Sequence, residues 1–268
     1  MISPRLAASF ALGLGLMFAA SALQKAPVPS SEYPSPMVRE EQTVIVDGVT
    51  EVWQLIWVGK PKPICEPTDA SLTCPCQGFA YGEGGFLDLI RMRNGIELDR
   101  LPLAPFFKEW RVAVVQRWQP DTDKDFKLSM RPDFPAIVAK RPITQVMHLA
   151  DYDHDGLPDE FYLQTEAQPC GKSFGIVIGI SKRNPRLHAF GTASKPHKPL
   201  YLQKEEWEAL RDASGPIEVV DWGCGDHASD TQTTLRLRWT PAGIDGSRRT
   251  FACTPDDKPG ILTGEEPL

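Results

Sequence analysis

Apolar and polar residues alternate in short runs along most of this chain, a pattern typical of β-strands that bury one face. In residues 49–58 the alternation places Trp53 and Trp57 on the same face. Asp47-Gly48 separates this run from residues 43–46, and an Asp-Gly pair favours the tight turn of a β-hairpin. We therefore expect an antiparallel hairpin whose aromatic face packs in a core.

Further strand-like runs follow, joined by turn residues such as Asn94-Gly95 rather than by helices. They comprise residues 86–92, 96–101, 110–118, 143–149, 161–165, 174–180, 187–190, 217–222, 233–239 and 248–253, the last two joined near 243–246. Residues 203–213 have a helical pattern with Trp207 and Leu210 on one face, whereas residues 119–141 predict an irregular surface loop. The pattern predicts a mainly β fold of antiparallel hairpins, a sandwich or an irregular barrel, with one short packed helix.

The first 22 residues have the features of a signal peptide. Arg5 precedes an apolar run over residues 6–20, and Ala20-Ser21-Ala22 is an A-x-A cleavage site. The alternative is an uncleaved membrane anchor, but the run is short for a membrane span. Residues 23–41, rich in proline and serine, predict an extended linker, and residues 42–268 predict a single β-rich domain. We expect a secreted or periplasmic protein with no membrane span after cleavage.

Composition limits the classes of partner. The 268 residues are 41% hydrophobic, enough for a sizeable core, and carry a formal net charge of −6. Removal of the signal peptide takes away only one charged side chain, Arg5, and makes the balance more acidic. Nucleic acids and anionic membranes bind to concentrated basic faces, so this composition argues against both.

Six cysteines in an exported chain predict disulfide bonds. Cys74 and Cys76 are too close in sequence to bridge easily, so we expect Cys65 to pair with one of them and to pin a local loop. The other would then join one of the remaining three, which are Cys170, Cys224 and Cys253. A zinc site formed by Cys65, Cys74 and Cys76 is the alternative, but C-x-C is not the usual zinc-binding spacing.

An acidic loop over residues 151–160, Asp-Tyr-Asp-His-Asp-Gly-Leu-Pro-Asp-Glu, connects two strand-like runs. Crowded carboxylates repel one another unless a hard cation neutralises them, and calcium accepts six to eight oxygen ligands in flexible geometry. Gly156, at the sixth position, permits the sharp turn that points alternate side chains inward. The predicted Ca2+ ligands are the side chains of Asp151, Asp153, Asp155 and Asp159 and the carbonyl of Leu157. The alternative is a solvated acidic turn.

This loop resembles the D-x-D-x-D-G-x-x-D element of FG-GAP and VCBS-type repeats, in which a calcium loop joins two strands. The apolar flanks at 148–150 and 161–163 fit that setting. The loop is EF-hand-like only in part, because Tyr162 stands where an EF-hand has a bidentate glutamate. The resemblance implies a calcium site and a local turn, and a single copy does not imply a propeller. A second acidic run, residues 121–125, has Phe126 in place of the turn glycine.

Two segments could carry catalysis. Residues 171–175 match the G-x-S-x-G pattern of serine hydrolases, but a strand-like run follows where that motif requires a helix. The segment from Asp221 to His227 combines acids, an imidazole and glycines, although nothing positions a nucleophile there. We therefore expect a noncatalytic binding or envelope-associated module for a protein or carbohydrate ligand, with a secreted hydrolase that uses Asp221 to His227 as the alternative.

Overall fold

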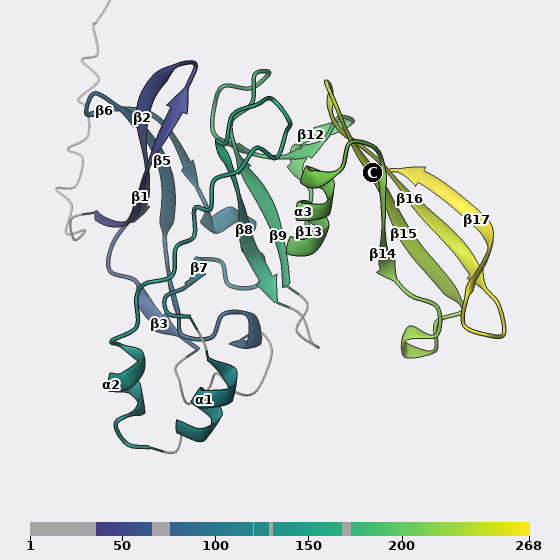
Figure 1. Ribbon diagram of the computed structural model, residues 1–268, viewed down its shortest axis with the longest axis horizontal. Coiled ribbons are helices and arrows are strands. Elements are labelled where there is room, and N and C mark those ends of the chain that lie inside the picture. Colours follow the sequence, from purple (N-terminus) through teal and green to yellow (C-terminus); the bar gives the residue numbers. More distant parts are fainter. Residues whose placement is uncertain (1–35, 66–75, 120, 129–130, 168–172) are drawn as a thin grey trace, which may run out of the picture. The chain divides into compact units, whose positions relative to one another are not determined.

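The computed structural model describes residues 36–65, 76–119, 121–128, 131–167 and 173–268, which belong to one compact unit (Figure 1). The predicted signal peptide, most of the predicted linker, Cys74 and Cys170 lie outside these residues. The prediction of a mainly β fold is confirmed, since almost every strand pair is antiparallel. Over these ranges, no helix has both the length and the apolar character needed to cross a bilayer.

The first sheet contains the two predicted hairpins. Its order is β1-β2-β5-β6, formed by β1 (Met37–Val46), β2 (Val49–Trp57), β5 (Leu87–Arg93) and β6 (Ile96–Pro102). Asp47 and Gly48 both have positive φ values, 51° and 74°, as a tight hairpin turn requires. Trp53 and Trp57 are buried in the core, as predicted. β1 begins at Met37, inside the segment predicted as linker, because the strand continues to pair with β2 as far as Trp57.

A small sheet and two short helices follow. The sheet has the order β3-β4-β7, formed by β3 (Lys62–Ile64), β4 (Gly82–Gly85) and β7 (Ala113–Gln116), and short 3-10 turns occupy Cys76–Gly78 and Ala104–Phe106. The expected irregular loop at 119–141 instead contains α1 (Thr122–Leu128) and α2 (Phe134–Val138). Phe134 and Val138 are buried against Tyr81, and this local cluster stabilises helices that the scattered aspartates and prolines concealed.

The central sheet surrounds β9. The strands β8 (Glu160–Ala167), β10 (His188–Ala189) and β13 (Leu202–Gln203) all pair with β9 (Ser173–Gly179). The prediction of a strand at 143–149 is wrong, because among these seven residues only Ile143 makes a bridge, to Trp118. The carboxylate of Glu40 accepts the backbone N–H groups of Val146 at 2.7 Å and Met147 at 2.9 Å. A side chain thus takes the place of a neighbouring strand.

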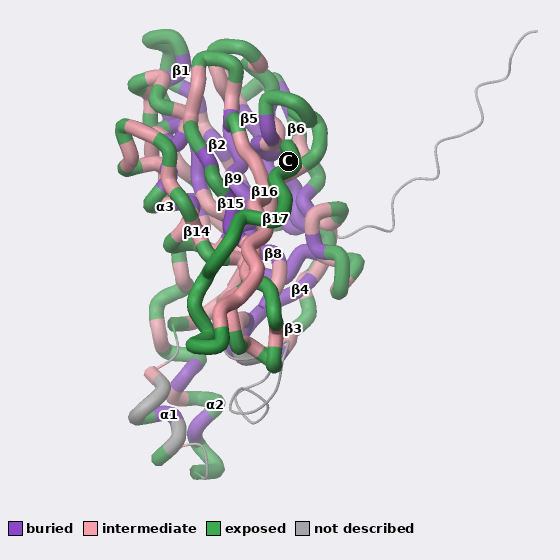
Figure 2. Tube along the Cα trace, turned by 90° about the vertical axis from the view of Figure 1, so that its right-hand side faces the viewer, coloured by how far each residue is buried: buried purple, intermediate pink, exposed green. Residues whose placement is uncertain are grey.

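The C-terminal sheet has the order β12-β11-β16-β15-β14, and β17 pairs with β16. Its strands are β11 (Gly191–Thr192), β12 (Lys195–Pro199), β14 (Ile217–Trp222), β15 (Thr231–Thr240), β16 (Gly243–Cys253) and β17 (Pro259–Pro267). The predicted turn at 243–246 is displaced, because Gly243 already pairs with Thr240. β17 is a further strand that the sequence pattern did not indicate, and Figure 2 shows it exposed along its length.

The predicted helix is α3 (Lys204–Asp212), which begins with a capping box between Gln203 and Glu206. Trp207 and Leu210 are fully buried, as the spacing predicts, and pack with Leu237 of β15. In Figure 1, α3 lies between the β8–β9 pair and β14.

Two disulfides lie in the described part of the chain. Cys65 pairs with Cys76 at a Cα–Cα distance of 5.2 Å, which confirms the predicted local bridge and excludes the alternative zinc site. Cys224 pairs with Cys253 at 5.7 Å and joins the end of β14 to the end of β16. The first bridge lies within the connection from β3 to β4, the second spans β15 and β16, and both restrict the unfolded chain.

Candidate metal centre

The acidic loop is closed at its base by a two-residue bridge. The N–H of Ala150 donates to the carbonyl of Glu160 at 2.8 Å, and the N–H of Glu160 donates back to Ala150 at 3.2 Å. Glu160 is the first residue of β8, so the bridge ties the loop to the central sheet. It also places the side chain of Glu160 beside the first residues of the loop.

Carboxylates at alternate positions give the loop its shape. Asp151 accepts the backbone N–H groups of Asp155 at 3.1 Å and Gly156 at 3.0 Å, and Asp153 accepts that of Asp155 at 3.0 Å. Gly156 has a φ of +93°, which confirms the need for glycine at this turn. His154 also has a positive φ, +63°, an uncommon conformation for a residue with a side chain.

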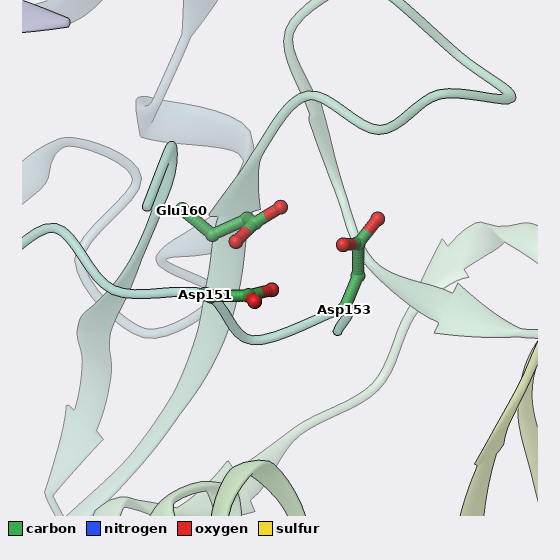
Figure 3. Close-up of side chains that lie close together, drawn as sticks. All are labelled: Asp151, Asp153 and Glu160. Carbon is green, nitrogen blue, oxygen red and sulfur yellow. The ribbon is translucent and has the colours of Figure 1, made fainter. Parts of the chain in front are cut away.

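Three carboxylates converge on one space. Asp151, Asp153 and Glu160 each direct an oxygen to within 4.8 Å of the other two, and Figure 3 shows the three groups pointing toward one another. Ca2+ binds oxygen at about 2.3–2.6 Å, so ligands on opposite sides of the ion lie roughly 4.6–5.2 Å apart. The spacing of the three oxygens is therefore compatible with a shared calcium ion.

Burial makes this cluster electrostatically unfavourable without a cation. Glu160 and Asp159 have only 0% and 1% of their surface exposed. The N–H of Tyr152 donates to Oε2 of Glu160 at 2.9 Å, but no N–H or O–H of the described residues donates to Glu160 Oε1 or Asp159 Oδ1. Those oxygens can be neutralised by a proton shared between the two carboxyl groups or by a bound cation.

Burial also shifts the pKa values of the carboxyl groups in this loop. Burial, followed by the nearby charge of Asp155, raises the pKa of Asp153 to about 6. Burial also raises the pKa of Glu160 and of Asp159 well above the ordinary range of carboxyl groups. Asp153, Asp159 and Glu160 therefore hold protons more tightly than free carboxylates do.

The neighbouring basic side chains do not neutralise the cluster. Lys182 donates to the carbonyl of Asp155 at 2.5 Å, but its ammonium lies 4.0 Å from the Asp155 carboxylate and is exposed. Arg91 lowers the pKa of Asp159 slightly through its charge, yet its guanidinium is already bound to Glu51 at 2.8 and 2.9 Å. Among the described residues, no basic side chain forms an ion pair with Asp151, Asp153 or Glu160.

The structure brings together two of the predicted ligands and one residue that the sequence analysis missed. Asp151 and Asp153 lie in the cluster, and Glu160 completes it. Oδ1 of Asp155 accepts the N–H of Leu157 at 2.9 Å instead. The ligand roles of Asp155, Leu157 and Asp159 stay predictions. The signal for Glu160 was its position between the acidic loop and the apolar run at 161–163.

The second acidic run forms the start of α1 rather than an ion loop. Asp125 accepts the hydroxyl of Tyr81 at 2.8 Å and forms an ion pair with Arg141. Asp121 accepts the backbone N–H of Lys124 at 3.4 Å, near the beginning of the helix. Both described carboxylates thus have structural partners.

The segments considered for catalysis have structural roles in the described chain. Ser173 begins β9, so a strand follows it where a nucleophile elbow has a helix. Asp221 pairs with Arg248 at 3.0 Å. His227 stacks on Trp222, and its Nε2 lies 3.7 Å from Asp226, beyond hydrogen-bond distance. Within the described residues, no base-to-nucleophile hydrogen bond is formed at this segment.

The chain matches no protein-family model, no curated protein and no solved structure. The arguments for function therefore rest on the geometry of the acidic loop and on the disulfide-bonded β fold.

Proposed function

We propose that this protein is an exported calcium-binding β module in which Asp151, Asp153 and Glu160 hold one Ca2+ ion. The observation that carries the proposal is the carboxylate of Glu160, which is fully buried, faces two further acids and receives no N–H hydrogen bond on Oε1 from the described residues. Such a group is stabilised by a cation at the point where the three oxygens meet. An all-oxygen donor set favours a hard cation over zinc or copper.

Calcium fits this loop better than magnesium does. Magnesium requires nearly octahedral geometry at about 2.0–2.1 Å and usually retains several waters, whereas calcium tolerates irregular sets of six to eight oxygens. We propose that Asp155, Asp159 and the carbonyl of Leu157, together with water, supply further ligands. The likeness of the loop to the calcium loops of FG-GAP and VCBS-type repeats supports the same choice.

The proposed role is binding rather than catalysis. The ion and the disulfides would stiffen loops between strands, and pre-organised loops bind a ligand with a smaller loss of entropy. The disulfides support export to an oxidising compartment, outside the cell or in a periplasm. The ligand class we propose is a protein or a carbohydrate at the module surface. A secreted hydrolase is less well supported, because His227 is exposed and forms no hydrogen bond to an acid of the described residues.

Thermal unfolding of the mature chain tests the ion site. Unfolding is followed in excess EDTA, then with increasing calcium, with magnesium as the comparison. We expect a calcium-specific rise in Tm, because a ligand that binds only the folded state stabilises it by mass action. Asp153→Ala should abolish the rise, whereas Asp256→Asn, which alters an exposed acid in a turn far along the chain, should retain it. An equal calcium response in Asp153→Ala would exclude this site.

A further inference from the structure

We infer that calcium binding at the acidic loop latches α3 and β15 onto the central sheet through the ring of Tyr152. This inference rests on the proposed function and concerns what the ion controls. The loop alternates two kinds of residue. Asp151 and Asp153 turn toward the shared space, while the intervening Tyr152 and the following His154 contact the C-terminal part of the fold.

Tyr152 connects the ion site to α3 directly. Its backbone N–H donates to Oε2 of Glu160 at 2.9 Å, so its main chain is part of the site. Its ring is 3% exposed and meets Trp207 edge to face, with centroids 6.4 Å apart and planes at 86°. The guanidinium of Arg211 lies 5.4 Å from the centre of the same ring. One residue therefore touches both the carboxylate cluster and two turns of α3.

His154 adds a second contact, to β15. Its ring lies 6.2 Å from that of Trp239, which packs edge to face against Phe190 at 5.8 Å. The left-handed backbone of His154 is maintained by the same turn that Asp151 and Asp153 organise. A change in the arrangement of these carboxylates would therefore move both rings.

The helix has other anchors, so the latch controls local opening rather than folding. Trp207 donates to the carbonyl of Gly175 at 3.1 Å, and Leu210 packs with Leu235 and Leu237. Without the ion, the converging carboxylates have no shared ligand to hold them together, the loop loosens, and α3 loses the contact with Tyr152. We expect α3 and β15 to remain folded but to open more often.

Hydrogen exchange of the full mature chain, with calcium or with EDTA, measures this opening. Calcium should slow exchange in peptides from α3 and β15, by up to about 100-fold at 100 times Kd, the limit that linkage sets. Peptides from β1 and β2 should change far less. Tyr152→Leu keeps the backbone N–H and an apolar side chain but removes the ring, so it should lose the protection of α3 even at calcium concentrations that saturate the variant.

Calorimetric titration of the same proteins with calcium tests the ion site separately from the latch through Tyr152. Tyr201→Leu, which removes a partly buried tyrosine that contacts Phe106 and Lys108, is the matched control and should keep the calcium-dependent protection. Calcium binding with unchanged exchange in α3, or full protection in Tyr152→Leu, would overturn the latch and leave the ion site intact. Absence of calcium binding to the wild-type chain would overturn the proposed function and the latch together.

Discussion

Replacement of Glu160 by glutamine separates the charge of this residue from its shape. Two charged carboxylates within 4.8 Å of each other repel by at least roughly 3.5 kcal/mol at an effective dielectric constant of about 20. Glu160 faces two such groups, and burial raises its pKa, so the ion-free protein holds this carboxyl group in its neutral form. Glutamine resembles that neutral form, and we expect Glu160→Gln to change the stability of the ion-free protein by less than about 1 kcal/mol.

The calcium response of Glu160→Gln should be much smaller than that of the wild-type protein. A ligand at 100 times its Kd stabilises the folded state by about 2.7 kcal/mol, which raises Tm by roughly 5–10 °C in a domain of this size. If the loss of one carboxylate weakens binding about 100-fold, the same calcium concentration stabilises the variant by only about 0.4 kcal/mol, or roughly 1 °C. The expected result is thus an unchanged Tm in EDTA and an almost complete loss of the calcium-induced shift.

Paired thermal scans of wild type and variant provide the assay. Glu266→Gln, on the exposed strand β17, is the matched control and should keep the full calcium shift. A normal calcium shift in Glu160→Gln would refute the role of the buried carboxylate. A large loss of stability in EDTA would refute the argument that Glu160 is neutral without the ion.

Three further predictions concern the scaffold. Glu51→Ala should lower the free energy of unfolding by about 3–5 kcal/mol, because it leaves the guanidinium of Arg91 buried without its partner. Burial raises the pKa of Glu51, but its hydrogen bonds, led by that from Arg91, outweigh burial and lower this pKa below 4.5. Wild-type stability should therefore fall as the pH drops through the lowered pKa. Acid titration of Glu51→Ala should lack this contribution. Replacing both Cys224 and Cys253 by alanine opens a bridge with a sequence separation of 29 and should cost about 3.6 kcal/mol in denaturant unfolding; a loss below about 1 kcal/mol would contradict the chain-entropy argument. Gly175→Ala should destabilise the protein by about 2–3 kcal/mol in the same assay, since its Cβ would lie 2.2 Å from the carbonyl oxygen of Leu163, and wild-type stability would show that the strand relaxes freely.

The predictable parts of the fold are those with local causes. Strand alternation and the Asp47-Gly48 turn predicted the first hairpin, and the spacing of Trp207 and Leu210 predicted α3. β17 was missed because it is exposed along its length and therefore has no apolar alternation. The segment 143–149 was misassigned because its apolar residues suggest a strand, whereas Ile143 is exposed and only Met147 among them is buried. The distant carboxylate of Glu40 accepts two of its N–H groups, which a neighbouring strand would otherwise do.

The acidic site likewise contains residues that the sequence pattern predicts and one residue that it does not predict. Asp151 and Asp153 follow from the loop pattern, whereas Glu160 enters through the bridge to Ala150, which is a tertiary contact. The predicted bridge from the C-x-C pair to a more distant cysteine stays a prediction, because Cys74 and Cys170 lie outside the described residues. A peptide that links Cys74 to Cys170, recovered from a digest without reductant, would support that bridge, and a free thiol at Cys74 would oppose it.

Equilibrium dialysis against radioactive calcium tests the central claim most directly. After treatment with EDTA, the mature protein should bind one calcium ion per chain, excess magnesium should compete poorly, and Asp153→Ala should bind none. Absence of bound calcium in the wild-type protein, or undiminished binding by Asp153→Ala, would contradict the assignment of the ion to Asp151, Asp153 and Glu160.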